Sequence, residues 1–317
     1  MRKSIKGRLT TAVIIIVALT VLFSTGIIIG MSGRRITTEL TGELQLQADK
    51  YANSINSWIE MEKGLNDGTG ASIEALSAAE MDAAHLQPII SSHADGRAEL
   101  LNLYYGTADK LFIQADPNAT APEGYDPTMR GWYQAAESAG NTVVTDPYMD
   151  VLIGGMCITI ATPVYVNGEL VGVVGADFTL DTITDIVNSI PYEDGEYGFL
   201  VDSSSNFVIH ENSDYLPGED TATAVSDVMS ELSAIITNPG SEILKIKDYD
   251  NEGNYFATSS IAGCSWVLGL ALPTSNVSGS INPIILISII IAVIAIVVSN
   301  VIMSRLISQQ LDRKSVV

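Results

Sequence analysis

The sequence is poor in cationic residues and in side chains that bind transition metals. Its 317 residues include 16 Lys and Arg against 37 Asp and Glu, a formal net charge of -21, and only three histidines. So acidic a chain repels nucleic acid and anionic lipid headgroups. His85, His93 and His210 have no metal-like spacing, and no serine run has a partnered histidine and acid. We therefore expect no catalytic site, metal or cofactor, and no nucleic-acid partner.

Cysteine is also scarce. Cys157 and Cys264 each lie in an apolar, strand-like run, about 107 residues apart. Buried free thiols are the favoured interpretation, because cysteine is among the most buried residue types, and a single disulfide is the alternative.

Long uncharged apolar stretches occur twice. Residues 11–31 and 284–303 each contain about 20 residues without a charge, enough to cross a hydrocarbon core of ~30 Å as a helix. A cleaved secretory signal is the alternative for the first stretch, but its apolar run is too long and no small-x-small cleavage site stands out after it. We predict transmembrane helices at residues 11–31 and 283–303, the second with Asn282 as cap and Pro283 as first residue.

The flanking charges predict the orientation in the cell membrane. Basic residues precede the first span and follow the second, which favours the cytoplasm for residues 1–10 and 304–317. The basic residues concerned are Arg2, Lys3, Lys6, Arg8, Arg305, Arg313 and Lys314. Residues 32–282 would then be extracytoplasmic, with 36 acidic and 9 basic side chains and a net charge of 9 − 36 = −27.

The external region has the pattern of an α+β protein. Apolar residues at steps of three and four from Ile36 to Trp58 predict a long stalk helix within residues 32–66. Gly64–Gly70 predicts its end, followed by a short helix at 72–81 and then by strand-like runs. Two modules of similar strand order, residues 67–190 and 191–280, are expected to form antiparallel sheets.

The first of these modules contains the most specific local signals. Pro127 predicts the first turn of a helix from Asp126 to Ala139. Asn167-Gly168 between two strand-like runs predicts a hairpin.

One arginine, Arg130, lies among aromatic residues in this acidic module, and the next arginine is Arg305. A guanidinium offers a planar fork of donors to a carboxylate, whereas Asp and Tyr oxygens accept from an ammonium group. A pocket with both would suit a small zwitterion. The alternative is that Arg130 pairs with Asp126 and that Trp132 is a core residue.

The spacing of these residues resembles the double Cache (dCache_1) sensor domain of bacterial chemoreceptors and sensor kinases, in particular its amino-acid-binding members. The pattern is Tyr125-x4-Arg130-x-Trp132-Tyr133, then Pro147-Tyr148-x-Asp150, then Ile158-Thr159-Ile160-Ala161 and Val173-Val174-Gly175-Ala176-Asp177. The resemblance covers residues 33–280 and implies two PAS-like modules between two membrane spans.

The resemblance also implies a role for each motif residue. Arg130 and Trp132 would hold the carboxylate of the ligand, with Tyr125 assisting. Tyr133, Tyr148 and Asp177 would surround its α-ammonium group, with Asp150 a neighbour.

The expected function is a membrane receptor that binds an extracellular α-amino acid in its membrane-distal module, residues 67–190. The resemblance implies a homodimer and cytoplasmic signalling partners. Residues 304–317 show no clear HAMP linker, so we expect the output region to lie beyond this chain or elsewhere. A receptor for an organic acid, amine or purine is the alternative ligand class, and a membrane-tethered ectoenzyme the alternative function.

Overall fold

The computed structural model describes residues 5–79, 83–97, 99–152, 154–218 and 221–314. It divides into two compact units, Leu44–Leu272 and a unit formed by Met1–Glu43 with Pro273–Val317. The predicted basic positions Arg2 and Lys3 lie outside the described residues. Each unit is described separately.

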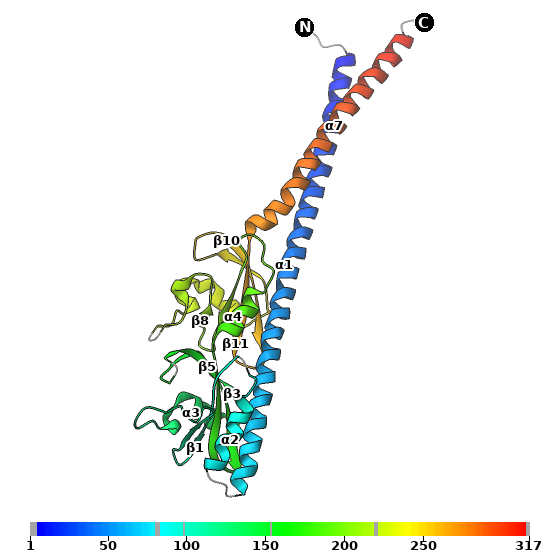
Figure 1. The fold of residues 1–317 in the computed structure, drawn as a ribbon. Coiled ribbons are helices and arrows are strands. Elements are labelled where there is room, and N and C mark those ends of the chain that lie inside the picture. The colour runs from blue at the N-terminus through cyan, green and yellow to red at the C-terminus, as the bar shows by residue number, and fades with distance from the viewer. Residues whose placement is uncertain (1–4, 80–82, 98, 153, 219–220, 315–317) are drawn as a thin grey trace. The chain divides into compact units, whose positions relative to one another are not determined.

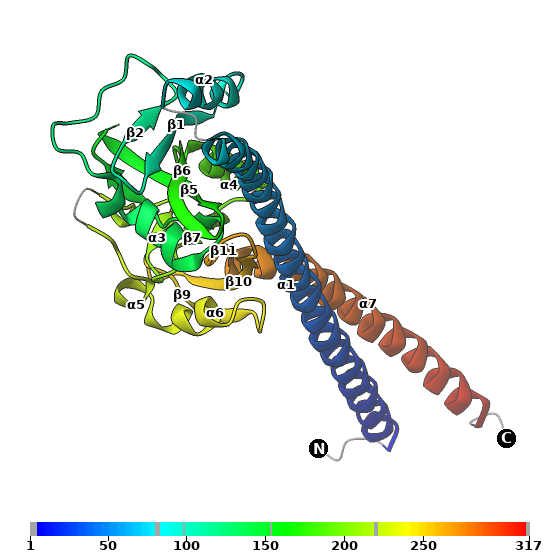
Figure 2. The ribbon, with the colours of Figure 1, turned by 90° about the horizontal axis from the view of Figure 1, so that it is seen from below.

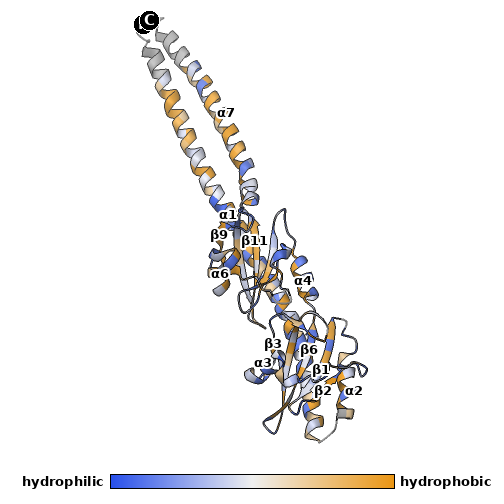
Figure 3. Ribbon diagram, turned by 90° about the vertical axis from the view of Figure 1, so that its left-hand side faces the viewer, coloured by the Kyte–Doolittle hydropathy of each residue, from blue (hydrophilic) through white to orange (hydrophobic). Residues whose placement is uncertain are grey.

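The unit formed by the two ends of the chain contains the two apolar helices (Figures 1 and 3). They are the first part of α1 (Ile5–Ala78) and most of α7 (Thr274–Lys314), and both are long and apolar enough to cross a membrane. The predicted start of the second helix is wrong, because α7 begins at Thr274 and Pro283 lies inside it. The side chains of Ser278 and Ser280 donate to carbonyls one turn earlier, within the turns that precede the proline.

The predicted end of the stalk helix is also wrong, because α1 runs without interruption through Gly64–Gly70 to Ala78. Glycine costs a helix interior about 1 kcal/mol relative to alanine, so contacts with the sheet must offset this cost. The amide of Asn66 donates to the carbonyl of Ile160 (3.0 Å) and to the hydroxyl of Thr162 (2.9 Å). A Cβ on Gly70 would lie 3.1 Å from the Thr162 methyl, so the missing side chain permits close packing.

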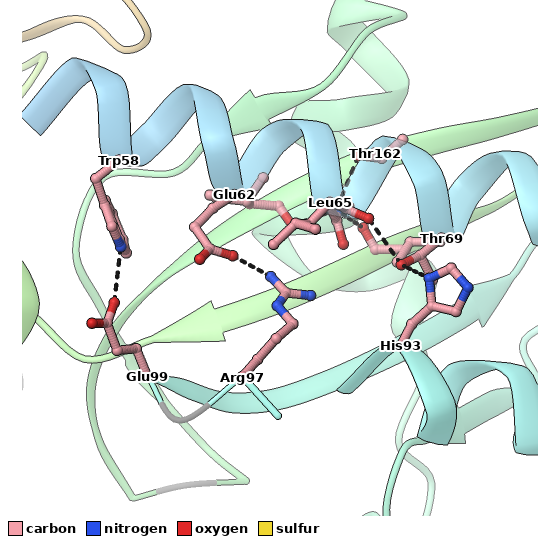
Figure 4. A network of polar contacts seen from close by, with 11 residues as sticks. Trp58, Glu62, Leu65, Thr69, His93, Arg97, Glu99 and Thr162 are labelled. Carbon is pink, nitrogen blue, oxygen red and sulfur yellow. Dashed lines mark hydrogen bonds and ion pairs between the residues drawn. The ribbon is translucent and has the colours of Figure 1, made fainter. Parts of the chain in front are cut away.

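Three further side chains tie the same part of α1 to the segment that precedes the first strand (Figure 4). The indole of Trp58 donates to Glu99 (2.9 Å), Glu62 pairs with Arg97, and Thr69 contacts the His93 ring (3.0 Å). His93 belongs to α2 (Ala83–Ala94), a helix beside β1 and β2 (Figure 2) that we did not predict.

The distal module, as predicted, is an antiparallel sheet with the strand order β2-β1-β6-β5-β3, and β4 pairs with β5. Its strands are β1 (Leu100–Thr107), β2 (Phe112–Gln114), β3 (Val143–Val144), β4 (Tyr148–Asp150), β5 (Gly155–Val166) and β6 (Glu169–Phe178). The predicted hairpin joins β5 to β6, with φ of 54° at Asn167 and 87° at Gly168. Positive φ at both positions is the requirement of a type I′ turn.

The second module, residues 191–280, is called the proximal module below. Its sheet repeats this order as β8-β7-β11-β10-β9. Its strands are β7 (Tyr197–Val201), β8 (Phe207–Ile209), β9 (Leu244–Lys247), β10 (Gly253–Ile261) and β11 (Trp266–Pro273). In each module the second strand in sequence order, β2 or β8, lies at an edge of the sheet. The last strand, β6 or β11, lies beside the first, β1 or β7. Three short helical segments lie between β8 and β9: α5 (Val225–Val228), η3 (Ser230–Leu232) and α6 (Ser233–Thr237).

One hydrophobic core joins α1 to both sheets. Ile55 and Ile59 of α1 are fully buried in the same cluster as Ile160 of β5, Leu200 of β7 and Trp266 of β11. The helix α4 (Asp181–Asn188), which follows the distal sheet, adds Ile183 and Val187 to this cluster. Because α1 contributes to the core of both modules, it forms the common support on which they are held.

Candidate ligand-binding cavity

Arg130 occupies a break between two helical segments. The predicted continuous helix is wrong: η1 (Pro127–Met129) ends before Arg130, which has extended backbone (φ −90°, ψ 145°) and caps α3 (Gly131–Ala139). Pro127 does begin the first segment, and the Asp126 side chain caps it by accepting from the amide of Thr128 (3.0 Å). The extended residue lets Arg130 leave the helical path at the edge of a cavity.

The alternative pairing of Arg130 with Asp126 is contradicted by the structure. Asp126 instead pairs with Lys110 (2.9 Å) and accepts from the hydroxyl of Thr128 (2.6 Å). The Arg130 guanidinium carbon lies 4.3 Å from the centre of the Tyr125 ring, and its Nε is buried without a hydrogen-bond partner. Within the described part of the chain, Arg130 forms no ion pair.

The cavity beside Arg130 has a volume of about 620 Å³. Four of the seven predicted site residues line it: Arg130, Trp132, Tyr148 and Asp150. The rest of the wall comes from the same module and from the proximal one, through Met129, Gly131, Ala135, Val144, Thr145, Asp146, Pro147, Met149, Val151, Ser203, Ser265 and Trp266.

Asp177 does not line the cavity but is buried next to the lining residue Asp150. Its side chain is fully buried on β6, and a carboxylate oxygen lies within 4.8 Å of one on Asp150. Oδ1 accepts from the hydroxyls of Tyr104 (2.7 Å) and Thr159 (2.7 Å), and Thr159 also contacts the Tyr148 hydroxyl (2.7 Å). Oδ2 is buried and has no hydrogen-bond partner among the described residues.

Burial raises the pKa of the Asp177 carboxyl to about 7. Hydrogen bonds from Thr159 and Tyr104 oppose the rise, and the charge of Asp150 adds to it. The half-satisfied carboxyl is therefore divided between its neutral and charged forms near neutral pH, and a cation beside Oδ2 would favour the charged form.

The two remaining predicted residues do not line the cavity. Tyr125 packs against Phe112 (4.7 Å between ring centres) and under Arg130, so it contacts the site through the guanidinium. Tyr133 is buried against Trp132. Burial raises the pKa of Tyr133, and the acids that add to the rise lie outside the cavity wall, among them Glu137. A contact between ligand and Tyr133 therefore remains a prediction.

The structure also assigns roles at the site that the sequence interpretation did not predict, although Thr159 lies in the motif. Tyr104 and Thr159 hold Asp177, and Trp266 reaches the cavity from the proximal module. Gly175 is the sequence feature that could have indicated the position of Tyr104. The two residues are paired across β1 and β6, and a Cβ on Gly175 would lie 2.2 Å from the Tyr104 ring. A glycine inside a strand often marks such a close approach.

Both cysteines are free, as the favoured interpretation predicted, but only Cys157 is buried and Cys264 is partly exposed. Cys157 is buried beside Asp150 and Asp177, and burial raises the pKa of its thiol, with the charge of Asp177 adding to the rise. It is therefore neutral at physiological pH and carries no anionic charge into the wall of the cavity.

A family model described as a Cache domain, dCache_1, matches residues 32–281 of the chain. The methyl-accepting chemotaxis protein McpA of Pseudomonas putida KT2440 is 37% identical over 179 residues, which are 53% of this chain and 25% of McpA. The chain thus spans about a quarter of the length of that relative.

Solved structures resemble about three quarters of the chain. The ligand-binding domain of the Pseudomonas aeruginosa PAO1 amino acid chemoreceptor PctB, in complex with L-Gln, is 25% identical with a TM-score of 0.62, covering 74% of this chain and 91% of that one. The ligand-binding domain of the Pseudomonas fluorescens chemoreceptor CtaA, with L-isoleucine, shares the fold at 23% identity and a TM-score of 0.65, covering 78% and 98% of the two chains.

Proposed function

Because the chain belongs to the dCache_1 family of Cache domains, we propose that it is the sensing part of a chemoreceptor-type membrane receptor whose distal module, residues 67–190, binds an α-amino acid. The observation that carries the proposal is a pair of unmatched groups at one cavity. Arg130 lines it without an ion pair among the described residues, and Oδ2 of Asp177 lies buried at its wall without a hydrogen-bond partner.

An α-amino acid carries the two charges that these groups lack. Its carboxylate would accept from the guanidinium of Arg130, with Trp132 beside it and Tyr125 supporting the guanidinium from below. Its α-ammonium would donate to Asp177, with Tyr148 and Asp150 on the cavity side. Charge-assisted hydrogen bonds contribute about 1.5 to 3 kcal/mol each, so a few of them correspond to a micromolar dissociation constant, about −8 kcal/mol.

The buried Oδ2 implies that binding includes a rearrangement. Asp177 is fully buried, whereas Tyr148 and Asp150 of β4 line the cavity next to it. For an ammonium group to reach Oδ2, β4 must shift relative to β6. The ligand would then bind two conformations with unequal affinity, which is the requirement for a signal.

The relatives support this assignment. PctB is described as an amino acid chemoreceptor, and its ligand-binding domain was solved with L-Gln. McpA is a methyl-accepting chemotaxis protein. By analogy, α1 and α7 would cross the cell membrane with residues 32–282 outside, the receptor would be a homodimer, and cytoplasmic partners would receive the signal through an output region.

The proposal is tested by thermal unfolding of the whole chain in nanodiscs with each of the twenty amino acids. We expect certain amino acids to raise the melting temperature, and the corresponding amines and carboxylic acids, which lack one of the two charges, not to do so. Arg130→Ala should abolish the shift. Lys110→Ala is the matched control, since it removes a cation from the same module but one that pairs with Asp126.

The alternative ligand classes give different results. If the ligand is an organic acid, Asp177→Asn leaves its binding intact, whereas amino acid binding is lost in that variant. If the protein is an ectoenzyme, the bound compound is recovered chemically changed. No shift with any amino acid in the wild-type protein contradicts the proposal.

A further inference from the structure

The strand β4, which carries Tyr148 and Asp150, is attached to the proximal module by the residue that precedes Pro147. Asp146 accepts three hydrogen bonds from that module. Its Oδ1 accepts from the indole Nε1 of Trp266 (2.9 Å) and from the amide of Ser203 (3.2 Å), and its Oδ2 accepts from the Ser203 hydroxyl. Trp266 is the first residue of β11 and is only 1% exposed.

On its other side, the same segment is bonded to the residues that hold Asp177. The amide of Thr145 donates to the carbonyl of Thr159 (3.0 Å), and the Thr145 hydroxyl accepts from the amide of Thr159 (2.9 Å). The hydroxyl of Thr159 donates to Asp177. Hydrogen bonds therefore join Asp177 to Thr159 and Thr159 to Thr145, and the peptide bond links Thr145 to Asp146. A further hydrogen bond joins Asp146 to Trp266 of β11.

Two cavities adjoin β4. One is the cavity beside Arg130, and the second, of about 290 Å³, is lined by Tyr148 and Met149 together with Asp202 and Phe207 of the proximal module. Among the described strands, β4 pairs only with β5. A strand with one partner and space beside it can shift at lower cost than a strand in the close-packed core.

The strand that receives these bonds leads directly out of the module. β11 ends at Pro273, and α7 begins at Thr274 with no loop between them. β11 also lies in the middle of the proximal sheet, between β7 and β10. A change at its first residue is therefore conveyed by a strand that continues into the second apolar helix.

From this arrangement we propose that Asp146 is a positioning residue that couples occupancy of the cavity to β11 through Trp266. The inference rests on the proposed function, since it takes an amino acid as the occupant. When β4 shifts to admit the ammonium group, Asp146 moves with it and changes the position of Trp266. Trp266 also lines the cavity, so the same residue forms part of the wall and receives the displacement.

A competing route runs along α1, which is bonded to both modules. Asn66 donates to the carbonyl of Ile160 in the distal sheet, and Asn56 accepts from the amide of Gly263 beside the start of β11. The experiment must therefore follow β11 and α1 separately.

Hydrogen exchange of the whole chain in nanodiscs distinguishes the route through β11 from the route along α1. The variant is Trp266→Phe, which removes the indole donor and keeps an aromatic ring. Trp58→Phe is the matched control, because it removes an indole hydrogen bond of the same length, to Glu99, on α1. Asp146→Asn is the second variant, since it keeps an acceptor oxygen and removes the charge.

The first arm uses no ligand. Loss of the Trp266 bond, made in the proximal module, should speed exchange at Tyr148–Asp150 in the distal module on the order of tenfold, the effect of one charge-assisted bond. Trp58→Phe should leave these amides unchanged. If Trp266→Phe and Asp146→Asn also leave them unchanged, Asp146 does not couple the modules.

The second arm adds a stabilising amino acid from the thermal screen. In the wild-type protein and in Trp58→Phe, the amides of β11 should become more protected. Because Asp146 and Trp266 also line the cavity, each variant is first brought to saturation with the amino acid, as judged by the response of β5 and β6. At saturation the change in β11 should be lost in Trp266→Phe and Asp146→Asn. A response confined to α1, or an unchanged response of β11 in both variants, overturns the inference. Failure of the wild-type protein to bind any amino acid overturns the proposed function instead, and the first arm still decides whether the link exists.

Discussion

The carboxyl of Asp177 makes the affinity for an amino acid depend on pH in a predictable direction. Burial raises the pKa of this group to about 7 in the ligand-free protein. The charged form is the one that binds an ammonium group, so the pKa must be lower in the complex. Binding then releases a proton wherever the free carboxyl is protonated, and the affinity falls as the pH drops below about 7.

The magnitude follows from the charged fraction of the free carboxyl. With a pKa of about 7, this fraction is about 0.03 at pH 5.5 and about 0.76 at pH 7.5. We therefore expect the dissociation constant to be roughly 25-fold higher at pH 5.5 than at pH 7.5. The α-ammonium of the ligand stays protonated over this range, so the change reports the protein.

Isothermal titration calorimetry measures both the dissociation constant and the number of protons released on binding. Titrations at pH 5.5 in two buffers with different ionisation enthalpies should show the release of about one proton per ligand. Tyr104→Phe should move the midpoint of the pH profile upward, because the Tyr104 hydrogen bond lowers the pKa of Asp177. Asp248→Asn is the control, since Asp248 is a buried acid of the proximal module whose pKa burial also raises. Equal affinity at both pH values, without proton release, would refute the assignment of Asp177 as the ammonium partner.

Three further variants test the structure, two of them at the site around Asp177 and one at the pair of Glu62 with Arg97. Gly175→Ala puts a Cβ 2.2 Å from the Tyr104 ring, so it should lower the free energy of unfolding in urea by about 1 to 3 kcal/mol and abolish the thermal shift with ligand. Glu62→Gln leaves the charge of Arg97 unpaired, where both side chains are only about a tenth exposed, and should cost about 3 to 5 kcal/mol without changing the affinity for ligand. Tyr104→Phe combined with Asp177→Ala removes a buried acid and its donor, so the chain should fold and keep its stability at pH 7.5 but bind no amino acid in calorimetry.

The architecture could be predicted from the sequence because its signals are local. The uncharged stretches gave the two apolar helices, and Asn167-Gly168 gave the central hairpin with the backbone angles that such a turn requires. The stalk helix was predicted too short because glycine is a local signal against helix, whereas the contacts of Asn66 that offset it come from strands about 100 residues away.

The candidate site was predictable to a different extent for each residue. Arg130 and Trp132 lie in one short motif and do line the cavity. The role of Thr159, which also lies in the motif, and the role of Trp266 could not be predicted in the same way, because they depend on strand pairing and on contact between modules. Tyr133 lies in the motif but does not line the cavity, because its ring packs in a hydrophobic cluster. A motif fixes the residue type but does not determine on which side of the helix the ring packs.

The two sheets contain an aromatic residue paired with a glycine at equivalent places. In the distal sheet, Tyr104 of β1 pairs with Gly175 of β6, and its ring covers the glycine. In the proximal sheet the strands at the same places are β7 and β11, where Phe199 pairs with Gly269 and covers it in the same way, with a Cβ there only 2.0 Å from the ring.

The difference lies in the polar atoms. Two residues after its glycine, the distal strand has Asp177 and the proximal strand has Ala271. The distal ring, Tyr104, has a hydroxyl that donates to Asp177, whereas the proximal ring, Phe199, has no hydroxyl. At this position the distal module therefore keeps a buried acid with an unsatisfied oxygen, which lowers stability until a cation binds. The proximal strand β11 has the apolar Ala271 at this position and offers no carboxylate there to an ammonium ligand. This strand is therefore suited to follow the distal module rather than to compete with it.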